Sequence, residues 1–196
     1  MTTTKKIVFT LLVLISIILF LSLLGSGLST KELPRLITSN SLIGEKAPSF
    51  SLITPGKTKV SLSNYEQKIV ILNFWNPNCL QCRQEAPLLQ QISSSFRKND
   101  VVFIGIEVPT IRSTLQETLD HIKKYGVDYT ILRDTEGTTT IDYGIITIPL
   151  TLIINHCGYI TNQINGPIKE PHITNQIKSL LDIKQTFSCN EIHKNL

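Results

Sequence analysis

The sequence lacks the features that mark a nucleic-acid-binding protein, a repeat protein or a strongly charged tail. Its formal net charge is only +4 over 196 residues, and acidic and basic side chains are interspersed along the chain. No basic stripe with interleaved aromatic residues is present, so no nucleic-acid partner is expected. No charge run or internal repeat is present either. The part that follows the N-terminal segment is long enough for one domain of ordinary size.

The N-terminal segment lacks charge over a long stretch. Between Lys6 and Lys31 lie 24 uncharged residues, and Ile7–Leu24 is mostly apolar. A helix that spans a bilayer needs roughly 20 apolar residues, whereas the apolar part of a cleaved signal has about 7–15. Because no A-x-A cleavage site or lipidation cysteine follows, a retained membrane anchor is favoured. A cleaved signal peptide remains the alternative interpretation. Lys5 and Lys6 should remain on the cytoplasmic side, so both interpretations export the rest of the chain.

These patterns divide the chain into four parts. We expect a cytoplasmic stub with a transmembrane anchor, or an uncleaved signal, at residues 1–28, and a polar tether at residues 29–42. A folded domain should follow at residues 43–185, with a C-terminal tail at residues 186–196.

The folded part alternates strand-like and helix-like segments. Continuous apolar runs rich in β-branched residues predict buried strands at Ile69–Trp75 and Val101–Glu107. A helix predicted over 113–125 has Leu115, Leu119 and Ile122 on one apolar face. The other expected elements are extended pieces near 50–53 and 59–62, a helix over 79–96, a short strand at 129–132, a hairpin of 150–154 and 159–164, and a helix over 171–183. This order indicates an α/β fold with a mixed central sheet flanked by helices.

Cys79 and Cys82 stand close together, at the end of the first buried strand and the start of a helix. Asn78 is a favourable helix N-cap, which would put Cys79 in the first turn. There the unpaired backbone N–H groups and the helix dipole favour an anion and lower the pKa of a thiol, so Cys79 is the expected attacking thiolate. Cys82, one turn further in and more shielded, would resolve a mixed disulfide. The spacing predicts a redox-active pair.

The same spacing is also half of a structural zinc site, but a second half is missing. Cys157 and Cys189 are 32 residues apart and form no second knuckle, and the four histidines show no ligand spacing among themselves. We therefore expect neither a metal nor a cofactor. A purely structural disulfide between Cys79 and Cys82 stays open as an alternative.

Two further residues have positions that fit the same chemistry. Glu85 lies three residues after Cys82 on roughly the same side of the helix, where a carboxylate could move protons during exchange. The alternative is a solvated surface glutamate. Pro149 directly precedes a predicted strand, either as plain strand punctuation or as a cis proline that sets the Ile148 backbone beside the cysteines as an edge for substrate.

Whole blocks of the sequence, taken in order, match a known pattern. They are IGEKAPSFSL at 43–52, NFW at 73–75, CLQCRQEAP at 79–87, LRD at 132–134, YG at 143–144, IPLTLIIN at 148–155 and Gly158. The chain thereby resembles the membrane-anchored thioredoxin-like proteins of the TlpA/DsbE type, which bacteria use as extracytoplasmic disulfide reductases. The resemblance covers nearly the whole exported part. It implies a thioredoxin fold with an N-terminal β-hairpin extension and an N-terminal transmembrane helix.

The resemblance also implies roles for single residues. Pro149 matches the family's cis proline facing the cysteines, Glu85 matches its functional glutamate, and Trp75 matches its tryptophan four residues before the first cysteine. Two positions depart from the pattern. Asn78 stands where the family usually has a second tryptophan, and Leu80-Gln81 replaces a dipeptide that usually contains proline. These positions shape the surroundings of the thiolate, so they bear on the redox potential and the partner surface and not on the fold.

For function, the resemblance implies a reductase in which Cys79 attacks an oxidised protein substrate, such as an apocytochrome c or another envelope protein. A membrane electron donor would restore the dithiol. The resemblance places the protein in the bacterial cytoplasmic membrane, single-pass, with its C-terminal domain on the periplasmic side. A disulfide oxidase or isomerase, and a Cu(I)-binding redox module, remain alternatives. A thioredoxin-fold peroxidase fits poorly because Asn76, and not threonine, stands three residues before Cys79.

Cys157 and Cys189 are expected to pair with each other far from the CxxC. If Pro149 lies near the site, the strand from Leu150 runs about 17 Å away from it over five residues. The turn that contains Cys157 would then lie at the opposite pole, and the closing helix would return Cys189 to that pole. We therefore predict a structural disulfide between them. Two unpaired thiols, or an intermolecular link through Cys189, are the alternatives.

Overall fold

Three buried strands form the centre of the sheet, and each arises from a run of apolar, β-branched residues. In a computed structural model, which describes residues 11–20, 22, 42–109 and 113–189, they are β3 (Ile69–Trp75), β4 (Val101–Glu107) and β6 (Leu150–Ile154). Every residue of β3 is buried, because the strand has a neighbour on each edge and an apolar layer on each face. Each fully buried Ile, Leu or Phe side chain contributes about 1.5–3 kcal/mol relative to exposure, so this strand anchors the core.

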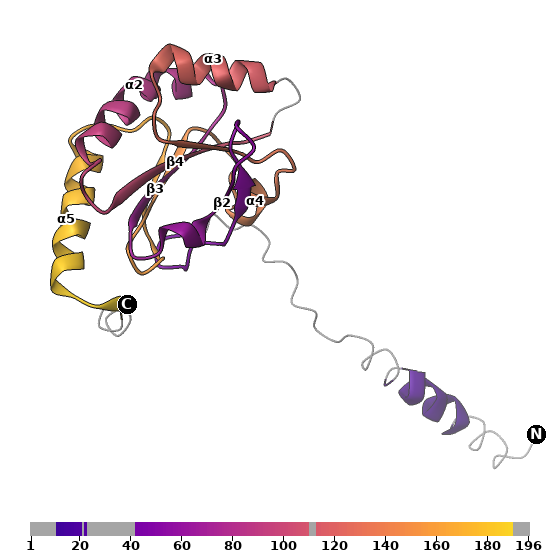
Figure 1. The fold of residues 1–196 in the computed structure, drawn as a ribbon. Coiled ribbons are helices and arrows are strands. Elements are labelled where there is room, and N and C mark those ends of the chain that lie inside the picture. The colour runs from indigo at the N-terminus through magenta and orange to yellow at the C-terminus, as the bar shows by residue number, and fades with distance from the viewer. Residues whose placement is uncertain (1–10, 21, 23–41, 110–112, 190–196) are drawn as a thin grey trace, which may run out of the picture. The chain divides into compact units, whose positions relative to one another are not determined.

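The sheet has seven strands in the order β2-β1-β5-β4-β3-β6-β7. Strands β3, β4 and β5 are parallel, whereas β1, β2, β6 and β7 pair antiparallel with their neighbours. The remaining elements are β1 (Ser51–Ile53), β2 (Lys59–Ser61), η1 (Leu62–Tyr65), α2 (Leu80–Ser95), α3 (Leu115–Tyr125), β5 (Thr130–Arg133), α4 (Thr138–Asp142), β7 (Ile160–Asn165) and α5 (His172–Thr186). The mixed sheet, its flanking helices and the N-terminal β1–β2 hairpin confirm the predicted thioredoxin fold (Figure 1).

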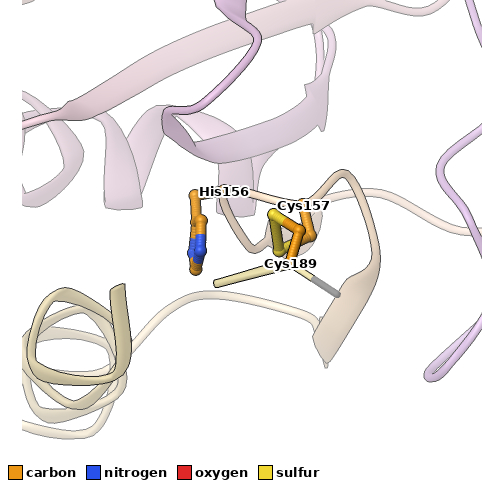
Figure 2. A group of neighbouring side chains, drawn as sticks. All are labelled: His156, Cys157 and Cys189. Atoms are coloured by element: carbon orange, nitrogen blue, oxygen red, sulfur yellow. A yellow bond between two sulfur atoms is a disulfide. The ribbon is translucent and has the colours of Figure 1, made fainter. Parts of the chain in front are cut away.

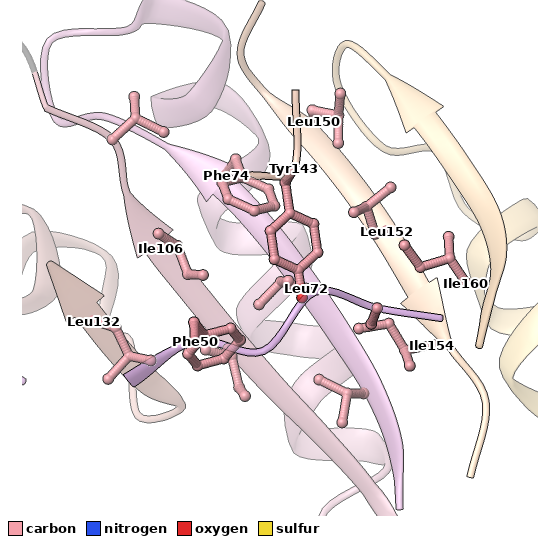
Figure 3. Packing of buried hydrophobic residues seen from close by; sticks show 14 residues of the cluster. Phe50, Leu72, Phe74, Ile106, Leu132, Tyr143, Leu150, Leu152, Ile154 and Ile160 are labelled. Carbon is pink, nitrogen blue, oxygen red and sulfur yellow. The ribbon is translucent and has the colours of Figure 1, made fainter. Parts of the chain in front are cut away.

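Two apolar layers cover the two faces of the sheet. On one face α2 and α5 pack over β3 and β4, with Leu89, Ile92, Ile173 and Ile177 among the buried residues (Figure 1). On the other face a cluster surrounds Tyr143, whose hydroxyl donates a hydrogen bond of 2.6 Å to the Pro48 backbone carbonyl. Among its other members, Figure 3 labels Phe50, Leu72, Phe74, Ile106, Leu132, Leu150, Leu152, Ile154 and Ile160.

The pairing of β3 with β6 defines the two ends of the sheet. Phe74 lies opposite Leu150, and Val70 lies opposite Ile154. The residues that follow β3 are therefore at the same end as the residues that precede β6. The turn that follows β6 is at the other end.

The inward face of α3 differs from the predicted one. Leu115 and Leu119 are 39% and 40% exposed, whereas Thr118 and His121 are buried. Thr118 Oγ1 donates a hydrogen bond of 2.7 Å to Glu107 Oε2. The buried Glu107 carboxylate also accepts from Arg133 Nε and Ser113 Oγ, so Thr118 is the contribution of α3 to a polar cluster that satisfies it. Of the predicted apolar face, Ile122 packs against the cluster around Trp75, but the prediction was wrong for Leu115 and Leu119.

The N-terminal unit, Met1–Asn40, is described only at residues 11–20 and 22, which are helical. Most of the anchor predicted at residues 1–28 thus lies outside the described residues. Among the helices that the structure describes, none combines the length and the apolar character needed to cross a membrane. The folded unit is Ser41–Leu196.

Candidate active site

The CxxC lies at the junction of β3 and α2. Cys79 and Cys82 are joined by a disulfide with a Cα–Cα distance of 5.2 Å. Cys79 is itself the N-cap of α2, and its Sγ accepts a hydrogen bond of 3.1 Å from the backbone N–H of Cys82. The prediction that Asn78 caps the helix was therefore wrong by one residue. The cause is Asn76, whose buried Oδ1 accepts the Asn78 N–H at 2.9 Å and closes the turn before the helix begins.

The two cysteines differ in accessibility. Cys79 is partly exposed, whereas Cys82 is only 2% exposed and packs against Trp75. The N–H group that points at Cys79 Sγ would stabilise a thiolate there once the disulfide is reduced. Arg83 adds positive charge in the first turn, where its Nη1 donates to the Pro77 carbonyl at 3.1 Å. This asymmetry suits Cys79 to attack and Cys82 to resolve.

Pro149 and Ile148 lie against the disulfide. The Ile148–Pro149 peptide bond is cis, and Cys79 Sγ is 3.9 Å from the Ile148 carbonyl oxygen. The loop before β6 thus presents backbone groups beside the more accessible sulfur. Between the cysteines, Leu80 and Gln81 are exposed, as is Asn78. These three side chains form part of the surface around Cys79.

Glu85 is buried at 3% exposure, which excludes the alternative of a solvated surface residue. Its Oε1 accepts from Asn73 Nδ2 at 2.9 Å, and its Oε2 accepts from the Ile168 N–H at 3.0 Å. Asn73 Nδ2 also donates to Thr151 Oγ1 at 3.0 Å. Burial raises the pKa of Glu85 to about 7, although the two hydrogen bonds to its charged form oppose the shift. A carboxyl group that titrates near neutrality can both give and take a proton.

Trp75 belongs to an aromatic stack behind Cys82. Its ring centroid is 4.2 Å from that of His121, which in turn is 4.7 Å from that of Tyr125. Burial, together with the charges of Arg83 and Lys124, lowers the pKa of His121 to about 4, so the ring is neutral at pH 7.

Sequence reasoning missed Asn73, Thr151 and His121. Asn73 and Thr151 are polar residues within buried strands, and buried polar side chains need hydrogen-bond partners. Their positions in the sequence could therefore have indicated a buried polar network. His121 was missed because the apolar spacing of α3 pointed to the wrong face.

The other two cysteines lie at the far end of β6. Cys157 and Cys189 are joined by a disulfide with a Cα–Cα distance of 5.4 Å. Asn155 Oδ1 accepts from the backbone N–H groups of Cys157 and Tyr159, both at 3.0 Å, and this fixes the turn. The structure thus brings Cys157 to Cys189 and keeps both at the opposite end of β6 from the CxxC.

Comparison with known proteins agrees with this geometry. The profile of the AhpC/TSA family matches residues 43–163. The thiol–disulfide oxidoreductase ResA of Halalkalibacterium halodurans is 31% identical over 128 residues, which are 65% of this chain and 70% of that protein. ResA of Bacillus subtilis is 27% identical over 130 residues, 66% of this chain and 71% of that one. A thiol:disulfide interchange protein of the thioredoxin family from Chlorobium tepidum is 28% identical, with a TM-score of 0.61 over 69% of this chain and 95% of that structure.

Proposed function

Because the chain belongs to the AhpC/TSA family, and within it to the thiol–disulfide oxidoreductases related to ResA, we propose that it reduces disulfides in oxidised proteins outside the cytoplasm. The observation that carries this proposal is the asymmetry of the CxxC. A partly exposed Cys79 receives the Cys82 N–H and lies beside the Ile148 carbonyl, while Cys82 is buried. That arrangement supports an attacking sulfur and a shielded resolving sulfur.

The reaction transfers two electrons in two exchange steps. The Cys79 thiolate attacks one sulfur of the substrate disulfide, a mixed disulfide forms, and the other substrate sulfur leaves and takes a proton. Cys82 then loses its proton and attacks Cys79 Sγ, which releases the second substrate thiol and closes the Cys79–Cys82 disulfide. Glu85 accepts the Cys82 proton in this step and returns it when the pair is reduced again.

The surface next to the reactive sulfur combines the polar Asn78 and Gln81 with exposed apolar side chains. Leu80 is 61% exposed, and Ile146, two residues before Ile148, is 75% exposed. These side chains support recognition of an extended, partly apolar segment, such as an oxidised cysteine pair of an apocytochrome c or another envelope protein. A dithiol electron donor in the membrane would return the CxxC to its reduced form.

The extracytoplasmic location is supported by the cysteines and the N-terminal segment. All four cysteines are in disulfides, which form and persist in oxidising compartments. Lys5 and Lys6 precede an apolar stretch that would tether the domain to the cytoplasmic membrane. Protease treatment of intact spheroplasts should digest the domain, whereas a domain protected until lysis would contradict this placement.

The direction of transfer is tested by the reduction potential of Cys79–Cys82, followed through Trp75, the single tryptophan of the chain. A potential below about −220 mV, toward that of thioredoxin, is the expected result for a reductase. A potential near about −120 mV would make the protein an oxidant and reverse the proposal. In parallel, Cys82→Ser should accumulate a mixed disulfide with substrate through Cys79, and Cys79→Ser should accumulate none.

A further inference from the structure

A second sulfur-containing cluster lies at the end of β6 away from the CxxC. It comprises His156, Cys157 and Cys189, whose ligand-type atoms all lie within 4.8 Å of one another (Figure 2). His156 and Cys157 come from the turn between β6 and β7, and Cys189 follows α5. Among the residues that the structure describes, this is the one group of three or more side chains placed to hold a metal ion. It shares no residue with the proposed redox site.

His156 has a ring nitrogen with no evident structural use. The side chain is 6% exposed, and its Nδ1 has no hydrogen-bond partner within the described part of the chain. The backbone of Phe187 hydrogen-bonds the ring, which leaves Nδ1 as the orphan nitrogen. Buried polar atoms are normally satisfied, so this unpartnered nitrogen is available as a metal ligand.

The surroundings also suit a bound ion. A pocket of about 370 Å³ borders the cluster and is lined in part by all three residues, so an ion could reach it from solvent. The turn is held by the Asn155 side chain, as described above, which keeps His156 and Cys157 in place.

We propose that this cluster, when its disulfide is reduced, is a Cu(I) site formed by the Cys157 and Cys189 thiolates and the imidazole of His156. Soft thiolate ligands select Cu(I), and imidazole is a common third donor. The disulfide form contains no thiolate. The Cys157–Cys189 bond therefore prevents metal binding until it is reduced.

The disulfide and dithiol forms of Cys157 and Cys189 interconvert by ordinary thiol–disulfide exchange. A dithiol, for example the reduced CxxC of a second copy of this chain, gives two electrons and two protons to Cys157–Cys189 and becomes a disulfide itself. The two thiols that result lose their protons to solvent when Cu(I) binds. Because the CxxC and this cluster are at opposite ends of β6, the donor of the two electrons must be another molecule.

The test uses the full chain with Cys79→Ser and Cys82→Ser, so that the CxxC binds no metal. Reduced and oxidised samples are titrated with Cu(I) in competition with bicinchoninate, without oxygen. We expect one equivalent of Cu(I) per reduced chain and none per oxidised chain. Lack of binding by the reduced chain, or equal binding by the oxidised chain, would overturn the proposal.

The role of His156 is tested separately. His156→Gln should lower the Cu(I) affinity at least tenfold, whereas His172→Gln, at an exposed histidine of α5, should leave it unchanged. Unfolding curves of the reduced variants check that they remain folded, and X-ray absorption of the loaded, reduced chain should show two sulfur ligands and one nitrogen. A shell of two sulfurs alone, or a preference for Zn²⁺ over Cu(I), would refute the assigned site. Both readouts are independent of reductase activity, because the CxxC is absent from the tested chain.

Discussion

Asn73 Nδ2 donates a hydrogen bond of 2.9 Å to Glu85 Oε1, which ties β3 to α2 one helical turn beyond Cys82. The same amide donates to Thr151, so three elements of the fold meet at one polar group. The network holds a carboxyl group in the core with its pKa at about 7. The protonation state of Glu85 therefore changes within the pH range in which thiol exchange takes place.

The first prediction concerns catalysis. Glu85→Gln should slow the reduction of a peptide disulfide at pH 8 by about 10–100-fold, because the variant lacks a carboxylate to accept the Cys82 proton. The rate of the natural protein should rise through an inflection near pH 7, and the variant should lose that inflection. Stopped-flow measurement of Trp75 fluorescence gives both quantities. Glu136→Gln, at an exposed glutamate, is the matched control and should retain the inflection.

The second prediction concerns stability of the oxidised protein. Since the folded pKa of Glu85 is raised above the ordinary value of 4.5, folding retains a proton that the unfolded chain releases. This contribution is fully present below pH 4.5 and is lost as the pH rises through 7. The free energy of unfolding of the natural protein, minus that of Glu85→Gln, should therefore fall by about 2–3 kcal/mol from pH 5 to pH 8.

Urea unfolding at several pH values measures that difference. His121, with its pKa lowered to about 4, contributes with the opposite sign, because its loss of stability comes as the pH falls below 6.5. That contribution is common to both proteins and cancels in the difference. A difference that stays constant with pH would show that Glu85 does not titrate near 7.

The third prediction concerns the packing behind the CxxC. A Cβ at position 105 would lie 2.7 Å from Ile131 Cδ1 and 3.0 Å from Trp75 Nε1. Gly105→Ala should therefore destabilise the protein by about 1–3 kcal/mol and change the Trp75 emission, since β4 and the indole must move apart. Gly56→Ala, where the nearest atom would be 3.7 Å away, should stay within about 0.5 kcal/mol in the same urea experiment. Equal effects at both positions would contradict this account.

The fourth prediction concerns the second disulfide. Cys157 and Cys189 close a loop with a sequence separation of 32, and the cross-link limits the freedom of the unfolded chain. Replacing both by serine should lower the free energy of unfolding by about 3–4 kcal/mol on the loop-entropy estimate. Guanidinium unfolding with the CxxC kept oxidised checks this value. The rate of peptide-disulfide reduction should be unchanged, and a loss of rate would mean that the two ends of β6 are coupled.

Three strands were predicted with their observed bounds. In each of them, the local composition determines the burial. Ile69–Trp75, Val101–Glu107 and Leu150–Ile154 were each predicted with the observed bounds, because apolar β-branched runs fit strands buried on both faces. The short α4 was not predicted, since a five-residue helix rich in threonine has no apolar period to detect. Its start depends on the Asp134 carboxylate, which accepts from the Thr140 N–H at 2.7 Å.

The candidate site was harder to predict from the sequence than the strands, since its geometry depends on contacts between residues that are far apart in the chain. The proposed roles of Cys79 and Cys82 followed from local spacing at a helix start. The burial of Glu85 did not, because it requires the Ile168 N–H from a loop that is 83 residues away in the sequence. The N-cap prediction failed for the same reason, as Asn76 Nδ2 is held by the Val108 carbonyl at the end of β4.

The chain enters the folded unit at the end of the sheet that lacks the CxxC. Lys46 forms a β-bridge with Tyr159, and the Ala47 N–H donates to the Gly158 carbonyl at 2.9 Å. The Gly44 N–H donates to the Ile160 carbonyl at 2.8 Å, so the entering segment is fastened to the β6–β7 hairpin. A tether on the N-terminal side of Gly44 would therefore act on the β6–β7 hairpin, at the opposite end of β6 from the CxxC. The CxxC lies at the other end of the sheet, so a substrate at Cys79 need not displace the segment by which the chain enters the domain.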